Sequence, residues 1–276
     1  MELPFTKMHG LGNDFIVIDA FDREINLEPD TIRKLADRHF GIGFDQLLLL
    51  SRPATSGADV NYRIFNSDGG EVSQCGNGAR CVATFLHDSG RISKPEIVAE
   101  TNEGILRLYR LDNGLVRVNM GVPRFEPADI PLRSAERQLR YQLTVNQQVL
   151  EFNALSMGNP HAVITVPDTE TAPVAELGSQ IQRESFFPES VNVGFMQVID
   201  AAHIRLRVYE RGAGETLACG SGACAAVVAG VLEGQLQADV NVSLRGGDLL
   251  VSWGGEGEPV WITGPAMTVF EGHVSI

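Results

Sequence analysis

Two cysteines occupy the same local sequence in the two halves of the chain. Cys75 and Cys219 each begin a Cys-Gly-x-Gly-Ala motif, the motifs are 144 residues apart, and an apolar stretch follows each of them. A thiolate removes a proton and a thiol delivers one, so two such groups on opposite faces of a carbon atom invert its configuration. The pattern therefore predicts an acid–base pair that inverts a stereocentre, with the thiol and thiolate roles exchanged when the reaction runs in reverse.

The glycines of the two motifs predict that each cysteine lies at the start of a buried helix, over residues 79–86 and 223–232. The unpaired amides and the positive end of the dipole at a helix start favour a thiolate, so we expect both thiols to have a lowered pKa. The same amides can hold a carboxylate that approaches the main chain closely. Because the α-proton of an amino acid is weakly acidic, such donors in a site closed to water would stabilise the carbanion, and no pyridoxal cofactor is then obligatory.

The similarity between the halves extends beyond the cysteines. Seven positions are identical at the offset of 144 residues: Arg63 and Arg207, Gly70 and Gly214, Glu71 and Glu215, and the Cys, Gly, Gly and Ala of the two motifs. Upstream, at an offset of 146 residues, Gly12-Asn13 matches Gly158-Asn159 and Gln46 matches Asn192. Two periods of this length indicate a duplicated domain rather than a solenoid. For Glu71 and Glu215 we expect a capping or turn role and no chemistry.

Short β-rich runs dominate the elements that must position these residues. We expect strands over residues 16–19, 47–50, 105–111, 204–209 and 249–253. Besides the two stretches after the motifs, we expect a helix over residues 31–39, capped by Asp30, and another over residues 173–183. The fold class is therefore α+β in two domains: residues 1–119, joined by a C-terminal strand at about 265–276, and residues 120–264.

Composition and charge argue against several classes of partner. The net charge is −13, from 22 basic and 35 acidic side chains, and no block of Lys or Arg is dense enough to follow a phosphate backbone. We therefore expect no nucleic acid partner. The longest nearly apolar stretch, residues 223–232, is about half of what a membrane-spanning helix needs, so we expect no membrane partner. Residues 1–10 lack the features of a signal peptide, which favours a reducing cytoplasm and cysteines that are thiols.

Long, ordered motifs carry a resemblance that covers essentially the whole chain. They are Met8-His9-Gly10-Leu11-Gly12-Asn13-Asp14-Phe15, Cys75-Gly76-Asn77-Gly78, Gly158-Asn159-Pro160-His161, Glu210-Arg211-Gly212 and Ala218-Cys219-Gly220-Ser221-Gly222. With these motifs the chain resembles the diaminopimelate epimerases. The resemblance implies conversion of LL-diaminopimelate to the meso form, in lysine and peptidoglycan precursor synthesis, without pyridoxal phosphate or metal. It also implies a homodimer of chains with two pseudo-symmetric domains, each a mixed or antiparallel sheet or barrel wrapped around a central helix, and an active site between the domains.

The resemblance also implies roles for individual residues. The acid–base pair is Cys75 and Cys219, and the backbone amides that bind the reacting carboxylate are those of Gly76, Asn77, Gly220 and Ser221. The distal end of the substrate falls to Asn66, Asn159, Asn192 and Arg211, and the polar lining is completed by Asn13 and Gln46. His161 and Glu210 are expected to tune the cysteine pair and to hold the reacting amino group. Phe270 stands where the family has an aromatic residue, often Tyr, at the dimer contact.

The same residues also fit structural or different functional roles. Cys81 and Cys224 lie inside the apolar stretches, where inert structural thiols are common. The cysteine spacings, with five residues between the first two and four between the last two, are not the tight pairs of a structural zinc site. A proline or hydroxyproline racemase would use the same two thiols on a substrate without a charged distal end. A non-catalytic protein with a redox-switched disulfide would need both cysteines only when they are oxidised.

Overall fold

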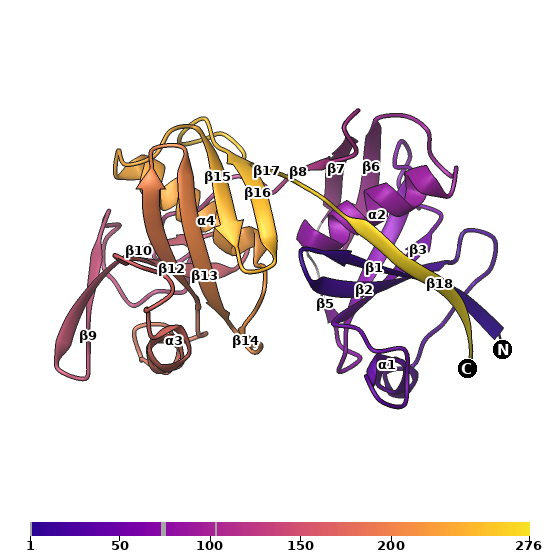
Figure 1. The fold of residues 1–276 in the computed structure, drawn as a ribbon, viewed down its shortest axis with the longest axis horizontal. Coiled ribbons are helices and arrows are strands. Elements are labelled where there is room, and N and C mark those ends of the chain that lie inside the picture. The colour runs from indigo at the N-terminus through magenta and orange to yellow at the C-terminus, as the bar shows by residue number, and fades with distance from the viewer. Residues whose placement is uncertain (1, 73–75, 103) are drawn as a thin grey trace. The chain divides into compact units, whose positions relative to one another are not determined.

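The computed structural model describes residues 2–72, 76–102 and 104–276. The chain divides into two compact units, each of which combines strands with two helices (Figure 1). The first unit consists of Met1–Val118 and Thr263–Ile276, and the second unit consists of Asn119–Ile262. The C-terminal segment therefore belongs to the first unit, although it follows the second in sequence.

The two units contain the same elements in the same order. The first run of elements is β1 (Glu2–Gly10), β2 (Asn13–Asp19), α1 (Pro29–Ala36), β3 (Gln46–Ser51), β4 (Val60–Asn66), β5 (Glu71–Val72), α2 (Gly76–Asp88), β6 (Glu96–Thr101), β7 (Gly104–Arg110) and β8 (Val116–Asn119). The second run is β10 (Gln148–Ser156), β11 (Pro160–Thr165), α3 (Val174–Gln182), β12 (Asn192–Asp200), β13 (His203–Glu210), β14 (Gly214–Glu215), α4 (Gly220–Leu232), β15 (Asp239–Leu244), β16 (Gly247–Ser252) and β17 (Trp261–Gly264). Each predicted strand is observed. The strands end within one residue of their predicted ends and begin one to three residues earlier than predicted.

Strand pairing also repeats. The pairs β1–β2 and β10–β11 are antiparallel, β2–β3 and β11–β12 are parallel, and β3–β4 and β12–β13 are antiparallel. A second parallel pair joins β4 to β6 and β13 to β15. An extra strand covers the edge beside β1 and β10: β18 (Met267–Ser275) pairs with β1, and β9 (Tyr141–Val145) pairs with β10, both antiparallel. The mixed sheets and the repeated order confirm the predicted α+β class of two pseudo-symmetric units.

Each unit has a buried helix among its strands. Helix α2 contacts β1, β2 and β7 of its unit, and α4 contacts β10, β11, β12 and β16 of the other. Helix α4 buries Gly220 and every residue from Gly222 to Gly230, and its small side chains let the strands approach it closely. Both helices begin three residues earlier than expected, at Gly76 and Gly220, because the motif glycines continue the helix instead of preceding it.

Helix α1 differs from its prediction at both ends. Glu28 occupies the N-cap position and Asp30 lies in the first turn, since Pro29 is well suited to the first helical position. The helix ends at Ala36, not at His39. Asp37 leaves the helical conformation, with ψ of 123°, and its carboxylate accepts hydrogen bonds from the amides of His39 and Phe40, each at 2.8 Å.

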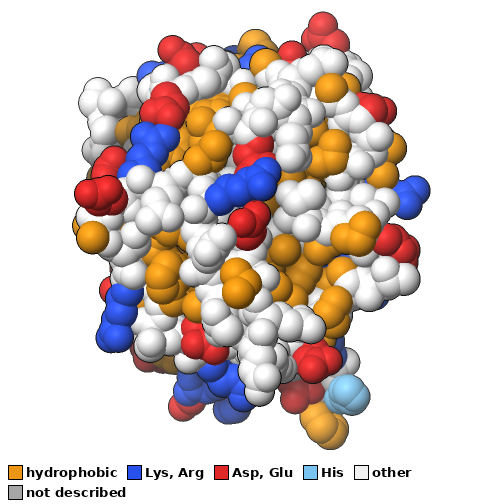
Figure 2. All heavy atoms as spheres, turned by 90° about the vertical axis from the view of Figure 1, so that its left-hand side faces the viewer, with side chains coloured by type: hydrophobic (Ala, Val, Ile, Leu, Met, Phe, Trp, Pro, Cys, Tyr) orange, Lys and Arg blue, Asp and Glu red, His pale blue; other side chains and the backbone are white. Residues whose placement is uncertain are grey.

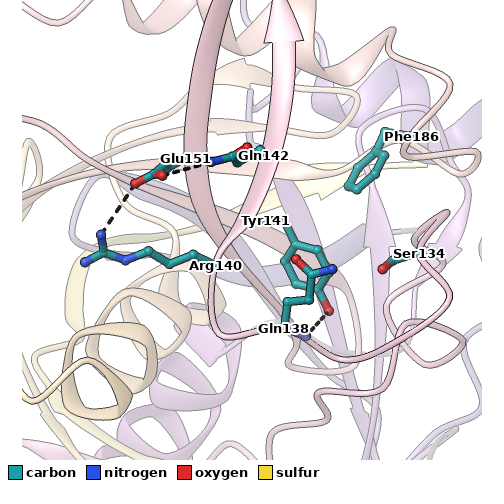
Figure 3. A pocket seen from close by; sticks show the side chains of 7 residues that line it. All are labelled: Ser134, Gln138, Arg140, Tyr141, Gln142, Glu151 and Phe186. Atoms are coloured by element: carbon teal, nitrogen blue, oxygen red, sulfur yellow. Dashed lines mark hydrogen bonds and ion pairs between the residues drawn. The ribbon is translucent and has the colours of Figure 1, made fainter.

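The surface of the second unit mixes side chains of all kinds. On the face in Figure 2, basic and acidic side chains alternate, and hydrophobic ones form separate small patches. A surface hollow of about 330 Å³ is lined by Ser134, Gln138, Arg140, Tyr141, Gln142, Glu151 and Phe186 (Figure 3). Glu151 accepts from Arg140 at 3.5 Å and from Gln142 at 3.1 Å, whereas the shorter hydrogen bonds of Arg140, both of 2.7 Å, go to Glu233 outside the hollow. The hollow contains none of the predicted site residues.

Candidate active site

Cys219 is the N-cap residue of α4, and the hairpin of β13 and β14 brings it back beside Glu210. Its thiol donates to Glu210 Oε2 at a distance of 2.9 Å, and Ser221 Oγ lies 3.7 Å from the same sulfur. The side chain is almost inaccessible to solvent, with 4% exposure. Cys75, the other predicted acid–base residue, lies outside the described residues. The described part of the candidate site is therefore centred on Cys219.

The expected lowering of the thiol pKa at a helix start is wrong for Cys219. Burial raises the pKa of this thiol well above its ordinary value, and the neighbouring Glu210 carboxylate raises it further. Hydrogen bonds from the Gly222 amide and from Ser221 lower it, but by less. Burial disfavours the charged form of any group, and a nearby negative charge disfavours a second one. Cys219 is consequently a protonated thiol, and it donates a hydrogen bond to the Glu210 carboxylate.

A chain of hydrogen bonds leads from His161 on β11 to the start of α4. His161 Nε2 lies 3.0 Å from Asn159 Oδ1, and Asn159 Nδ2 donates to Ser221 Oγ at 3.3 Å. His161 is 1% exposed, and burial, together with the positive charge of Arg211, lowers its pKa to about 3. The imidazole is thus neutral at physiological pH, and its Nε2–H donates a hydrogen bond to the side-chain oxygen of Asn159. Five predicted site residues thus form one connected cluster: Asn159, His161, Glu210, Cys219 and Ser221.

Asn192 and Arg211 are adjacent, but the amide of Asn192 bonds to backbone. Asn192 is 3% exposed; its Nδ2 donates to the carbonyl of Pro160 at 3.1 Å, and its Oδ1 accepts from the backbone amide of Arg211 at 2.9 Å. The Arg211 guanidinium donates to the carbonyl of Glu189 at 3.0 Å. Asn192 therefore fixes the backbone at which the Arg211 side chain begins.

In the first unit, the positions equivalent to these site residues carry side-chain amides. Gln46 Nε2 donates to Asn66 Oδ1 at 2.9 Å across the β3–β4 pair, and Asn77 Nδ2 donates to Asn13 Oδ1 at 3.2 Å. Within the described part of the chain, the buried Gln46 Oε1 has no hydrogen-bond partner. An acceptor of this kind is suited to a donor group of a ligand.

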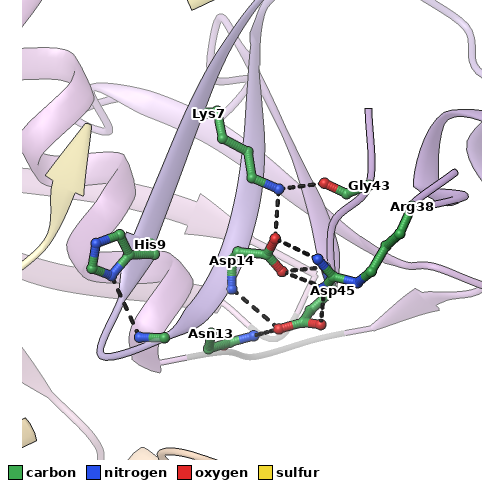
Figure 4. A network of polar contacts seen from close by, with 8 residues as sticks. Lys7, His9, Asn13, Asp14, Arg38, Gly43 and Asp45 are labelled. Atoms are coloured by element: carbon green, nitrogen blue, oxygen red, sulfur yellow. Dashed lines mark hydrogen bonds and ion pairs between the residues drawn. The ribbon is translucent and has the colours of Figure 1, made fainter. Parts of the chain in front are cut away.

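Four charged residues that the sequence analysis missed form a network that ends on Asn13 (Figure 4). Asp45 Oδ2 accepts from Asn13 Nδ2 at 2.8 Å, Arg38 bridges the carboxylates of Asp14 and Asp45, and the buried Lys7 binds Asp14. Burial raises the pKa of Asp14, but hydrogen bonds and charge from Arg38 and Lys7 outweigh it and hold this pKa at about 2. The sequence signals were weak: Asp14 stands in the first family motif, and Asp45 directly precedes Gln46.

A fully buried arginine supports the start of α2. Arg80 has 0% exposure; its guanidinium donates to Asn77 Oδ1 at 2.8 Å, to the carbonyl of Pro265 at 3.1 Å and to that of Gly76 at 3.4 Å. It thereby ties together the first turn of α2 and the segment before β18. A charged residue in an otherwise apolar stretch was the available signal in the sequence.

Glu71 and Glu215 have the same role, but it is not the expected capping or turn role. Glu71 binds Arg63 through two hydrogen bonds of 2.8 Å, and Glu215 binds Arg207 through bonds of 2.7 and 3.0 Å. Each ion pair spans the short hairpin that precedes a cysteine motif. Bidentate pairs of this kind fix geometry as well as adding stability.

Phe270, the predicted dimer contact, lies on β18 with 47% exposure, and its ring meets that of Phe5 edge to face at a centroid distance of 6.0 Å. Within the described residues, no group of three or more His, Cys, Asp and Glu side chains is placed to hold a metal ion. The helices of the described chain are all too short or too polar to cross a membrane.

The similarity to known proteins extends over the whole length of the chain. The family model described as diaminopimelate epimerase matches residues 5–126 and 153–269. The chain is 58% identical to diaminopimelate epimerase of Nitrosomonas europaea and 55% identical to that of Chromobacterium violaceum, over 100% of both chains in each case.

Solved structures with much lower identity share the fold. A hydroxyproline epimerase from Agrobacterium vitis matches with a TM-score of 0.71 at 18% identity, over 99% of this chain and 92% of its own. A phenazine biosynthesis protein of the PhzF family from Bacillus anthracis matches with a TM-score of 0.70 at 18% identity, over 100% of both chains. Because one fold hosts several reactions, these two matches define the architecture alone.

Proposed function

The chain belongs to the diaminopimelate epimerase family and is therefore an isomerase, and from this premise we propose that it converts LL-diaminopimelate to meso-diaminopimelate by a two-cysteine mechanism. The proposal includes a place in lysine and peptidoglycan precursor synthesis, and catalysis without pyridoxal phosphate or metal. The observation that carries it is the environment of Cys219: a buried thiol at the start of α4, hydrogen-bonded to a carboxylate.

Cys219 is suited to deliver a proton. It holds one at neutral pH because burial and Glu210 raise the pKa of its thiol. Cys75 would remove the α-proton as a thiolate from the other face, and in the reverse direction the two residues would exchange roles. Inversion requires both sulfur atoms to reach one α-carbon from opposite sides.

The start of α4 is suited to bind the reacting carboxylate. The first helical hydrogen bond runs from the amide of Ala223 to the carbonyl of Cys219, at 3.0 Å. The amides of Gly220 and Ser221 precede it and are not used by the helix, so they can donate to a carboxylate and to the negative charge that develops on it. Gly76 and Asn77 hold the equivalent positions in the first unit.

The polar residues of the two units favour a substrate that is charged at both ends. Arg211, with its backbone fixed by Asn192, supplies a cation, and the buried acceptor of Gln46 is suited to a donor such as an ammonium group. Diaminopimelate has a carboxylate and an ammonium group at its distal end, and proline has neither. We therefore propose Asn13, Gln46, Asn66, Asn159, Asn192 and Arg211 as the residues that line the remainder of the site.

The test is proton exchange in deuterated water. Purified, reduced protein is incubated with LL-diaminopimelate, and α-deuterium incorporation and meso product are followed by NMR. Wild type should incorporate deuterium as it inverts the stereocentre, and Cys75→Ala and Cys219→Ala should each lose epimerisation. Cys224→Ala is the matched control, because this thiol is fully buried inside α4 and does not adjoin the helix start.

The outcomes separate the rival functions. Exchange of proline but not diaminopimelate would retain the chemistry and reject the substrate. Full activity of both alanine variants under reducing conditions would reject the two-thiol mechanism. If no amino acid exchanges, and substitution of the cysteines has an effect only after oxidation, a redox-switched protein would be favoured.

We also propose that the enzyme is a cytoplasmic homodimer. The proposed mechanism needs reduced cysteines, which a reducing cytoplasm maintains. Exposed apolar side chains on β18, namely Met267, Val269 and Phe270, support a contact between two copies of this strand.

A further inference from the structure

Both carboxylate oxygens of Glu210 have a specific donor. Oε2 accepts from the Cys219 thiol at 2.9 Å, and Oε1 accepts a short hydrogen bond from the hydroxyl group of Thr216. Thr216 directly follows β14, and its own amide bonds to the carbonyl of Val208 on β13 at 3.3 Å. The hydroxyl group is thereby held on the same hairpin as the carboxylate that it binds.

The first unit provides an internal comparison. At the offset of 144 residues, Asn66 takes the place of Glu210 and Val72 takes the place of Thr216. The ion pair that closes the hairpin is nevertheless present in both units. It joins Arg63 to Glu71 in the first unit and Arg207 to Glu215 in the second. The hairpin therefore forms without a hydroxyl group, and the hydroxyl group occurs where the carboxylate occurs.

We propose that Thr216 is a positioning residue that holds the Glu210 carboxylate against the Cys219 thiol. A glutamate side chain has three rotatable bonds, and a single contact with a weak thiol donor leaves its terminal torsion poorly defined. A second donor on the opposite oxygen fixes that torsion. This inference rests on the proposed function, since it assigns Thr216 to the acid–base machinery of the same site.

Among the described residues, few polar groups lie around Cys219. Glu210 faces it from β13, Ser221 and the Gly222 amide face it from α4, and the neutral His161 on β11 reaches it only through Asn159 and Ser221. Arg211 follows Glu210 in sequence, and its charge acts on His161. Glu210 is thus the charged group whose orientation Thr216 can change.

The first test is kinetic. Thr216→Val replaces the hydroxyl group with a methyl group of similar size and introduces the residue that the first unit has naturally. We expect kcat for epimerisation to fall about tenfold, as for loss of a hydrogen bond to a charged group, with little change in KM. Thr216→Ser, which retains the hydroxyl group, should restore most of the rate. Thr165→Val, on the exposed end of β11, is the control for a threonine-to-valine change and should behave as wild type.

The second test needs no substrate. The thiol of Cys219 is titrated by NMR with cysteine labelled at Cβ, in wild type, Thr216→Val and Glu210→Ala. Because the aligned carboxylate raises the thiol pKa, Thr216→Val should move the Cys219 titration to lower pH, and adding Thr216→Val to Glu210→Ala should change nothing further. An unchanged or higher Cys219 pKa together with a wild-type kcat in Thr216→Val would overturn the inference. If diaminopimelate is not the substrate, the titration still decides the role of Thr216.

Discussion

At the residue scale, the chemistry of this site depends on burial as much as on residue type. A cysteine at a helix start predicts a lowered thiol pKa, yet Cys219 has a raised one because it is buried beside Glu210. Burial lowers the pKa of His161 and so keeps its imidazole neutral. The sequence showed these residue types and their spacing but could not show how far solvent is excluded from them.

The depressed pKa of His161 predicts a loss of stability in weak acid. The folded state keeps His161 neutral down to pH about 3, whereas the unfolded chain takes up a proton below its ordinary pKa of 6.5. The unfolded state therefore binds more protons throughout this window, and stability falls as pH falls through it. Between pH 7 and pH 5 the contribution of His161 to the free energy of unfolding should decrease by about 2 kcal/mol.

Urea denaturation of wild type and His161→Gln at both pH values measures this term. Glutamine retains a donor for Asn159 and does not titrate, so the variant should lose less stability than wild type on acidification by about 2 kcal/mol. All other titrating groups are common to both proteins. An equal loss in the two proteins would mean that His161 is protonated in the folded state.

At the element scale, the start of α2 is held by residues that no motif singled out. Arg80 binds the side chain of Asn77, which in turn binds Asn13, and Asp45 binds the other end of the Asn13 amide. Only one orientation of the two amides satisfies these contacts, because the guanidinium group can only donate and the carboxylate accepts. The side chains of Asn13 and Asn77, two predicted site residues, are therefore oriented by an arginine and an aspartate.

Arg80→Lys should disrupt this arrangement. A lysine ammonium group cannot reproduce the planar set of donors that reaches Asn77, Pro265 and Gly76 together. We expect a loss of about 2 kcal/mol in the free energy of unfolding and a raised KM for the substrate. Arg52→Lys, on a side chain with 72% exposure, is the control and should change neither quantity. Wild-type values for Arg80→Lys in urea denaturation and in kinetics would show that α2 does not depend on the guanidinium group.

The repeat explains how much of the fold could be predicted from the sequence. The matched motifs around Cys75 and Cys219 predicted two similar units. Gln46 and Asn192 do begin the equivalent strands β3 and β12, and Asn13 begins β2 where Asn159 directly precedes β11. The Arg–Glu ion pairs could have been predicted too, since both partners are repeated at the same spacing. Contacts such as those of Asn192 with Pro160 and Arg211 join segments distant in sequence, and the local pattern does not determine them.

At the scale of the whole molecule, the proposed homodimer predicts the effect of one side chain. Phe270→Glu places a charge on the exposed face of β18 and should convert a species of about twice 29.9 kDa into a monomer in light scattering after size-exclusion chromatography. Val149→Glu, on β10 with 63% exposure, is the matched control and should leave the mass unchanged. A monomeric wild type, or a Phe270→Glu variant that keeps the larger mass, would contradict the proposed contact.

The pairing of β18 with β1 has a consequence for the order of folding. The first unit needs Thr263–Ile276, which a ribosome makes only after all of the second unit. Since domains made during synthesis generally fold as units, the second unit, continuous from Asn119 to Ile262, has its complete set of strands before the first has its own. Until this segment has been made, β1 presents an unpaired strand edge, since its final partner is translated after the whole of the second unit.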